Sequence, residues 1–529
     1  MAQKQITPLV EDLVKQFKPT VYKEFVPPDV EKLEVSLITT KIVSFYERIR
    51  NTLDYQEEHL VRRNGIARYL RRMIIVEGKR KNLAQTLLTE LIRTKYLENK
   101  KVPVTKIPDI EKIIDKYLYL IEPYDKTITD RKSSAVVKWL IAVMACEIEE
   151  KLFPLVRDRA TVMAMYQYLK TELVYVNNPL PEQERDVQLY LTVWRGLIKS
   201  DHPLLRYELL KLYYPDWNNP SAETSSGASA HLEKLIDNID RQIKNPFGEK
   251  LTRFLKKHNI YFSILRDVLM VKASDSMATV SDTGKLSLAV EDACNTRYKE
   301  ARKKLHRSVV RSVLYIFITK MTLGLILEVP YDLIVYGSVI FTPLIINIVF
   351  HPVLMFLITI PISVPSKKNT QKIVKGVSDI IYGEKSDKLI YKHRRSSVTL
   401  NFFFGLFYLL MFAVSFGIII TILRRLDFSV LSGFLFLLFL SIISFFAIRI
   451  RYHAKELVVL DRRDGILSFL FDILTLPILR AGRWVSMNSQ KINIFIFILD
   501  NIIEAPLKMV VSGVEELTGF VKEKKEELQ

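Results

Sequence analysis

The chain has 529 residues, of which 49% are apolar and 26% charged, so it can bury a substantial core, and disorder is excluded as its main state. Its formal net charge is +19. Residues 1–300 contribute +7 of this charge and residues 301–529 contribute +12, so most of the excess lies in the more apolar part of the chain. That combination indicates basic anchors at a membrane surface and argues against a nucleic-acid partner.

The cysteines and the N-terminus indicate the compartment. Cys146 and Cys294 are the only two cysteines and lie far apart in helix-like stretches, which excludes a disulfide framework and fits a reducing compartment. The first residues have neither the uninterrupted apolar core of a signal peptide nor the Arg-rich, acid-poor composition of a transit peptide. We therefore expect residues 1–300 to stay in the cytoplasm.

Helical periodicity runs through this first part of the chain. Apolar residues recur at three- and four-residue steps, as at Leu87 and Leu91, and no strands alternating with turns are visible. The sequence predicts an all-α fold, with an N-terminal cytoplasmic helical domain over residues 1–214. A linker of small and polar residues follows at 215–230, and a helical stalk over 231–311 reaches the membrane.

Residues 312–364 predict a broken membrane hairpin. Its first segment, Ser312 to Leu327, is about 24 Å long at ~1.5 Å per residue, which is short of the ~30 Å hydrocarbon core. This segment can span if it is extended or tilted; otherwise it re-enters or lies in the interface. We place the connection at Glu328 to Asp332, and the second segment, Leu333 to Val364, is long enough to cross but contains three prolines.

Residues 401–448 predict a transmembrane hairpin. Two uncharged apolar runs, Asn401 to Leu423 and Ser429 to Ile448, are joined by only five residues, too few for a folded element outside the membrane. The basic residues that flank the hairpin outnumber the two arginines in its loop, so the flanks are predicted to face the cytoplasm.

The remaining segments are predicted to lie on the cytoplasmic side. Residues 365–400 form a basic cytoplasmic linker before the hairpin. Residues 449–511 are interrupted by charges and prolines and are predicted to form interfacial amphipathic helices. Residues 512–529 form a charged tail.

Motifs for chemistry are missing from the sequence. No two of the eight histidines lie within five residues of each other, and two distant cysteines cannot complete a metal site. No Gly-x-Ser-x-Gly is present to hold a nucleophilic serine. We predict no cofactor, no metal and no enzyme activity.

Three polar residues stand at expected membrane depth: Lys320, Asn347 and His351. A lysine at the centre of a membrane helix costs roughly 2.5 to 3.5 kcal/mol on insertion, so it usually has a partner or water. Asn347 and His351 are four residues apart and share a helix face. They are candidates for an intramembrane polar site of the kind that a transporter or proton path uses. The alternatives are a polar clamp between packed helices, or a Lys320 that snorkels to the interface.

Eight basic residues near the apolar segments are candidates for contacts with anionic lipids. Each Lys or Arg near an anionic leaflet contributes about 1 kcal/mol, although ordinary topology signalling explains the same residues. They are Arg302, Lys303, Lys304, Arg307, Lys367, Lys368, Arg394 and Arg395.

Three segments carry a resemblance to known proteins: residues 57–64 (EEHLVRRN), 350–357 (FHPVLMFL) and 496–508 (IFILDNIIEAPLK). They resemble uncharacterised polytopic membrane proteins of small-genome candidate-phylum bacteria. The resemblance implies a membrane location and transfers no mechanism.

These observations predict a multi-pass protein of the bacterial inner membrane with a cytoplasmic N-terminus. Its expected role is that of a non-enzymatic scaffold that binds a protein partner or itself, on a bilayer containing anionic lipids. The alternative is a transporter or channel that uses the broken hairpin 312–364. A lipid-modifying enzyme is a third hypothesis, but it lacks any recognisable acid, base or metal set.

Overall fold

The computed structural model describes residues 4–18, 31–35, 58–78, 80–125, 130–177, 180–221, 227–273, 275–359, 365, 367–384, 387–392, 398–454, 457–460 and 466–489. These residues are mostly helical, with almost no strand, in agreement with the predicted all-α class. Two short strands that the sequence did not reveal, β1 (Leu173–Val176) and β2 (Leu389–Lys392), pair in a two-stranded sheet.

The chain divides into two compact units. We call Pro8–Leu173 together with Pro179–Phe262 the N-terminal unit, and Ser263–Asn493 together with Met1–Thr7 and Val174–Asn178 the membrane unit. This division differs from the expected break at 215–230, because the helices on both sides of that stretch pack against each other inside the N-terminal unit.

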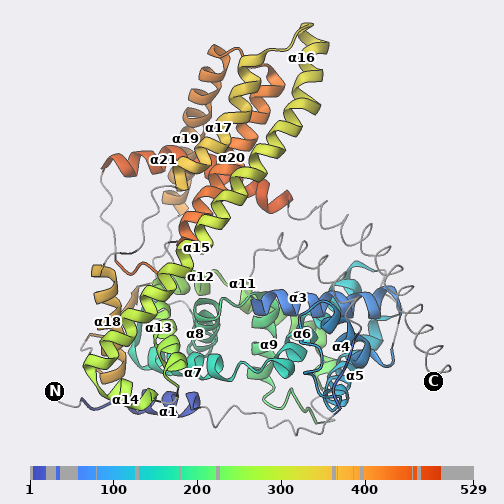
Figure 1. The fold of residues 1–529 in the computed structure, drawn as a ribbon, viewed down its shortest axis with the longest axis vertical. Helices are drawn as coiled ribbons and strands as arrows, with labels where there is room; N and C mark the ends of the chain where they lie inside the picture. The colour runs from blue at the N-terminus through green and yellow to red at the C-terminus, as the bar shows by residue number, and fades with distance from the viewer. Residues whose placement is uncertain are drawn as a thin grey trace, which may run out of the picture. The chain divides into compact units, whose positions relative to one another are not determined.

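Helix α6, which has 22 residues, is the longest helix of the N-terminal unit, and most of its residues are apolar (Figure 1). Asp130 caps α6 by accepting a hydrogen bond from the Lys132 backbone N–H at 3.1 Å. The helix packs against α3, α5 and α9. The elements of this unit are α1 (Pro8–Phe17), α3 (Glu58–Arg71), η2 (Arg72–Val76), α4 (Leu83–Arg93), α5 (Lys106–Asp125), α6 (Arg131–Leu152), α7 (Val156–Glu172), α8 (Glu182–Leu197), α9 (His202–Tyr213), α11 (Leu232–Lys244) and α12 (Pro246–Phe254). Helix α13 (Lys256–Val271) runs from this unit into the membrane unit.

The membrane unit is made of long apolar helices and the segments that join them. Its elements are α14 (Ser276–Ser281), α15 (Thr283–Leu323), η3 (Gly324–Glu328), α16 (Val329–Tyr336), α17 (Phe341–Thr359), α18 (Lys367–Tyr382), α19 (Val398–Arg425), α20 (Val430–Ala454) and α21 (Ile466–Ser489). Asp282 caps α15 by accepting hydrogen bonds from the backbone N–H groups of Gly284 and Lys285.

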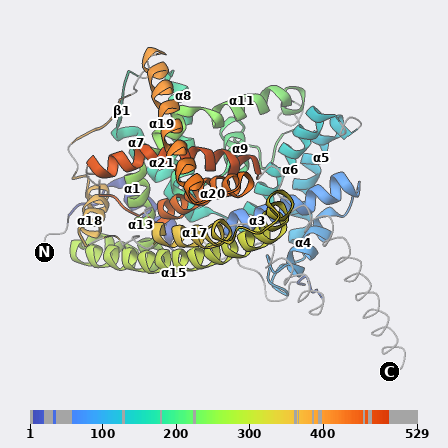
Figure 2. The same cartoon turned by 90° about the horizontal axis from the view of Figure 1, so that it is seen from above.

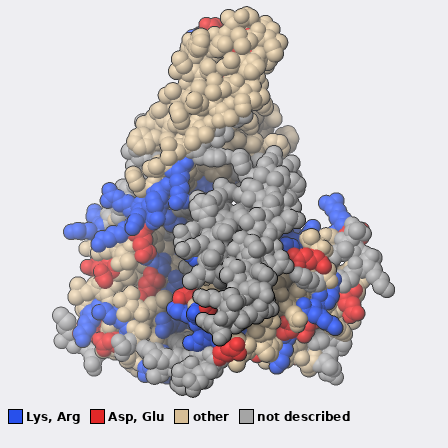
Figure 3. Space-filling view, turned by 45° about the vertical axis from the view of Figure 1, so that its right-hand side comes forward, with Lys and Arg blue, Asp and Glu red and all other residues tan. Residues whose placement is uncertain are grey.

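Four helices of this unit are long and apolar enough to cross a membrane: Thr283–Tyr336, Phe341–Ile358, Phe402–Arg425 and Val430–Ile450. The first combines α15, η3 and α16 in one continuous helix of 54 residues. Figure 3 shows that the visible surface over these helices is almost free of charged side chains. The length and composition of these helices are those of a membrane protein.

The helices form two hairpins whose short connections lie at the same end (Figure 1). The connection in the second, residues 426–429, lies where the sequence places it. The connection in the first lies at 337–340 and not at Glu328 to Asp332, because the helix continues through these residues, with Pro330 in the turn that follows η3. Helix α17 packs between α15 and α20 (Figure 2).

The other segments of the membrane unit brace these hairpins. Helix α21 crosses α19 and α20 and packs against both (Figure 1). Helix α18 is fixed to α15 by Asn369, whose Nδ2 donates to the Tyr298 hydroxyl at 3.0 Å and whose Oδ1 accepts from the Val459 backbone N–H at 2.8 Å. The expected charged tail 512–529 and the expected interfacial helix Ile492 to Val511 lie outside the described residues.

Candidate functional site

A turn of π-helix decides which residues of the first long helix face the other helices. In an unbroken α-helix, at about 100° per residue, the eight steps from Lys320 to Glu328 would turn the two side chains about 80° apart. The π turn η3 takes up one extra residue, so Glu328 stands within roughly 20° of the Lys320 face. Asp332 follows one α-helical turn later, and all three side chains are buried, with at most 2% of their surface exposed.

Helix α17 places its two polar side chains against this face. Asn347 and His351 are four residues apart, as the sequence indicates, and are 1% and 0% exposed. Gly324 allows the close approach of the two helices, because a Cβ at that position would stand 3.0 Å from a Leu344 methyl group.

Asn347 joins a cation to an anion inside this bundle. Its Oδ1 accepts a hydrogen bond from Lys320 Nζ at 3.1 Å. Its Nδ2 donates to both carboxylate oxygens of Glu328 at 3.0 Å. The Ser432 hydroxyl, from α20, donates to Glu328 at 3.1 Å. The positive charge of Lys320 and the negative charge of Glu328 therefore balance each other, with the neutral Asn347 amide hydrogen-bonded to both.

The remaining donors of Lys320 are directed at α20. Its Nζ lies 3.5 Å from the Leu435 carbonyl oxygen and 4.3 Å from the centre of the Phe439 ring. A carbonyl oxygen and the face of an aromatic ring are both favourable neighbours for an ammonium group. Lys320 is thus held inside the bundle and does not snorkel.

His351 bridges α17 and α20 through both ring nitrogens. Nδ1 lies 3.0 Å from the Asn347 carbonyl oxygen, and Nε2 lies 3.1 Å from the Phe436 carbonyl oxygen. The Phe436 ring stacks edge-on against the imidazole at 4.9 Å between centroids. The structure therefore brings together the three polar residues that the sequence singled out, Lys320, Asn347 and His351, in one buried cluster.

Three further members of this polar cluster were missed in the sequence: Glu328, Asp332 and Ser432. The two acidic residues stand beside Pro330, in a stretch that has the composition of a loop. The sequence signal that identifies them is their four-residue spacing, which places two carboxylates on one helix face. Ser432 gives no signal, since a serine is unremarkable in an apolar helix.

An apolar layer borders the polar cluster on the side away from the hairpin connections. It consists of Ile316, Met355, Ile443 and Ala447, all buried, with partly buried hydrophobic residues packed around them. Asp332, at the other end of the cluster, is only one turn from the end of α16. The polar cluster thus lies nearer the hairpin connections, and this apolar layer lies farther from them.

The candidate lipid-contacting residues are exposed wherever the structure describes them. Arg302, Lys303, Lys304 and Arg307 lie on the surface of α15, and Lys367 and Lys368 on the first turn of α18. The hydrogen bond between Asn369 and Tyr298 places these two sets side by side. Arg394 and Arg395 lie outside the described residues.

The N-terminal unit holds buried ion pairs on the acidic end of α6. Arg62 donates to Glu149 at 3.1 Å, and Lys116 donates to Glu147 at 2.5 Å. Burial raises the pKa of Glu149 to about 7, although Arg62 opposes the shift. Burial also raises the pKa of Glu147 and lowers that of Lys116, each against the attraction of the other. These pairs join α6 to its neighbouring helices.

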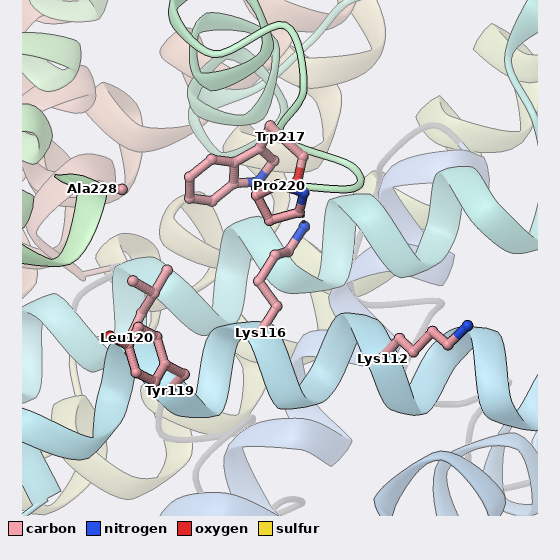
Figure 4. Close-up of a pocket in the computed structure, with 7 residues that line it drawn as sticks. All are labelled: Lys112, Lys116, Tyr119, Leu120, Trp217, Pro220 and Ala228. Carbon is pink, nitrogen blue, oxygen red and sulfur yellow. Dashed lines mark hydrogen bonds between the residues drawn. The ribbon is translucent and has the colours of Figure 1, made fainter. Parts of the chain in front are cut away.

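A hollow of about 400 Å³ lies between α5 and the segment that follows α9. Figure 4 shows Lys116 rising from α5 toward Trp217 and Pro220. The Lys116 ammonium is already bound to Glu147 and donates to the Trp217 carbonyl oxygen at 2.8 Å. Lys112 and Tyr119 therefore carry the polar side-chain groups of the lining that are left to orient a ligand. Across the described residues, no three His, Cys, Asp or Glu side chains gather in a way that could hold a metal ion.

No protein-family model matches the sequence, and no match to it was found among curated proteins or solved structures. The resemblance to membrane proteins of candidate-phylum bacteria therefore stays a prediction.

Proposed function

We propose that the protein is a membrane-anchored scaffold, in which the four apolar helices serve as an anchor and the N-terminal unit binds a protein partner in the cytoplasm of a bacterium. The observation that carries this proposal is the apolar layer of Ile316, Met355, Ile443 and Ala447. A path for ions or solutes has to be polar and wet throughout, because unpaired polar groups in hydrocarbon are costly.

The contacts inside the polar cluster agree with an anchor. Lys320, Asn347 and Glu328 bind one another, and they use up hydrogen-bonding groups that a substrate would otherwise need. Polar side chains that bind across helices in this way stabilise helix association in membranes. The exposed basic residues of α15 and α18 support a cytoplasmic location for that end of the unit.

The buried ion pairs of the N-terminal unit support a binding role more than a catalytic one. Arg159 binds both Glu208 at 2.9 Å and Glu150, and Lys211 donates to Glu150 at 2.9 Å. Carboxylates that are each held by a cation fix the helices that carry them and are poorly placed to accept a substrate proton. The role that remains for the N-terminal unit is to bind a partner through its surface, which these ion pairs hold in a fixed shape.

A transporter is the second candidate, and one specific observation favours it. The Asp332 carboxylate is buried, and its Oδ1 has no hydrogen-bond partner among the described residues. Intramembrane acidic groups of this kind mark ion or proton paths in many transporters.

Purified full-length protein in liposomes separates the two candidates. Flux of protons, sodium or potassium is recorded with indicator dyes, beside empty liposomes and beside the Lys320→Met and Asp332→Asn variants. The anchor predicts no flux above that of empty liposomes. Flux that either substitution abolishes, while the protein still elutes as one folded species, would replace the scaffold with the transporter.

The binding role has its own test. The protein is cross-linked in native bacterial membranes, purified, and compared with a chain that starts at Ser263, so that most of the N-terminal unit is missing. A scaffold predicts a protein that is captured by the full chain and lost with the shortened chain. Identical captures from both chains would contradict a partner-binding N-terminal unit.

A further inference from the structure

The part of α15 that precedes its apolar stretch carries a row of exposed basic side chains. Between Lys299 and Arg311 the helix has six basic residues and one acidic residue, Glu300. The six basic side chains are all exposed: Lys299, Arg302, Lys303, Lys304, Arg307 and Arg311. Within the part of the chain that the structure describes, Arg302, Lys303, Arg307 and Arg311 form no ion pair. Like charges this close on one helix repel one another, so a bound anion stabilises them.

Helix α18 extends this row with a second set of lysines. They are Lys367, Lys368, Lys372 and Lys375, all exposed, and the helix has a single acidic residue, Asp379. Asn369 Nδ2 donates to the Tyr298 hydroxyl at 3.0 Å and so fixes α18 against α15. Lys368 directly precedes Asn369, and Arg302 follows Tyr298 by one helical turn on the same face of α15. Two helices therefore present their basic side chains together.

We call the exposed side chains nearest the apolar helices the basic surface: Arg302, Lys303, Arg307 and Arg311 of α15 with Lys367 and Lys368 of α18. Figure 3 shows Lys and Arg side chains gathered where the charge-free surface over the apolar helices ends. On α15 the exposed apolar side chains begin at Leu314, three residues after Arg311. On the other side, only residues 360–366 separate the end of α17 from Lys367.

These spacings place the basic surface at the depth of lipid phosphates. At ~1.5 Å per residue, Arg311 and Arg307 lie about 5 and 10 Å along the helix axis from Leu314. The polar headgroup region adds roughly 5 to 8 Å to each side of the hydrocarbon core. Arginine side chains can direct their charged ends along a helix toward this region, and the guanidinium group binds phosphate through two parallel hydrogen bonds.

We propose that the basic surface binds the phosphate groups of anionic phospholipids in the leaflet at this end of the membrane unit. Position favours a lipid over an acidic protein or a nucleic acid, because the surface begins within one helical turn of side chains that face hydrocarbon. The proposal goes beyond the scaffold function and does not depend on it, since a transporter with this surface would bind the same lipids.

Native mass spectrometry of the full-length protein tests the basic surface. The protein is released from detergent micelles that contain equal amounts of phosphatidylglycerol and phosphatidylcholine with identical acyl chains, and the lipids that remain bound are counted. We expect at least about fivefold more phosphatidylglycerol on the wild type, roughly the factor that one basic residue near an anionic surface supplies. Lys367→Gln/Lys368→Gln and Arg302→Gln/Arg307→Gln should each lower this ratio toward one, because each removes two charges from one of the two helices.

The matched control is Arg424→Gln/Arg425→Gln, which removes two exposed charges from the opposite end of the apolar helices and should leave the wild-type ratio unchanged. An equal loss in this control would mean that overall charge, not the basic surface, selects the lipid. A wild type that retains both lipids equally contradicts the proposal, and if it instead retains added polyglutamate, the surface belongs to an acidic protein partner. Should one pair of substitutions prevent folding, the pair on the other helix decides the outcome together with the wild-type ratio.

Discussion

Gly482 in α21 lies so close to Ser441 in α20 that a Cβ on the glycine would stand 1.9 Å from the Ser441 carbonyl oxygen. The neighbouring atom is backbone and cannot turn aside, so the contact sets the distance between the two helices. Small residues at such crossings let membrane helices approach closely.

We therefore expect Gly482→Ala to force α21 away from α20 and to destabilise the membrane unit by about 1–3 kcal/mol, the usual cost of overpacking. Thermal unfolding of the detergent-solubilised protein measures the loss. Gly433→Ala, in α20, is the control, because a Cβ there meets no atom of the described residues within 4 Å. Equal melting temperatures for the two variants would contradict the close crossing.

The pairing of Lys320 with Glu328 predicts a strong interaction between their substitutions. Lys320→Met leaves Glu328 buried without its cation, which typically costs about 3–5 kcal/mol. Adding Glu328→Gln removes the uncompensated charge, so the double variant should be more stable than Lys320→Met alone. Thermal unfolding of the four proteins gives the coupling energy. Lys303→Met, on the exposed face of the same helix, should change little, and strictly additive effects at 320 and 328 would argue against the pair.

The raised pKa of Glu149 predicts the pH dependence of the N-terminal unit. The folded chain holds this proton with a pKa of about 7, against an unperturbed value of 4.5. The unfolded chain therefore loses the proton first as pH rises. Stability should be fully present below about pH 4.5, should decline by about 3 kcal/mol through pH 7, and should then level off.

Urea unfolding of the full chain, followed by tryptophan fluorescence, measures this decline. Trp139, Trp194 and Trp217 are buried in the N-terminal unit, and Trp484→Phe removes the signal of the membrane unit. Glu149→Gln should flatten the pH profile between pH 4.5 and 7. A profile with the same slope in the variant would assign the decline to another group.

The positions of the basic residues predict the topology. Cys146 and Cys294 are both buried and free, so they are replaced by Ala and single cysteines are then introduced at exposed positions. Ser338, in the first hairpin connection, should react with a membrane-impermeant maleimide in intact cells. Gln371, on α18 beside the exposed lysines, should react only after lysis. The reverse labelling pattern would show that the protein has the opposite orientation in the membrane.

The sequence predicts those features of the fold that a short run of neighbouring residues specifies by itself. The hairpin at 401–448 appears as α19 and α20 because two uncharged runs of sufficient length and a five-residue connection specify it directly. The first hairpin was predicted with its connection too early, because Glu328 and Pro330 have the composition of a turn. No residue type encodes a π turn, so the rotation that buries Glu328 was invisible.

The polar cluster was predicted in part for a similar reason. Lys320 and His351 stand out because ionisable residues are rare in apolar runs. Their partners on α20 are the carbonyl oxygens of Leu435 and Phe436, which every sequence offers. These two carbonyl oxygens reach Lys320 and His351 only because α17 packs between α15 and α20. The spacing of apolar residues in the sequence does not predict that packing.

The π turn at Gly324–Glu328 also gives a rule for recognising distant relatives of this chain. A relative without the inserted residue keeps the same face only if its acidic residue follows the lysine by seven positions instead of eight. To align both the lysine and the acidic residue of such a relative with Lys320 and Glu328, a one-residue gap is then needed inside a membrane helix. Alignment methods normally penalise gaps there. Such a gap, opposite Leu325 to Leu327, would mark the relatives that have retained the pair of charges and lost the bulge.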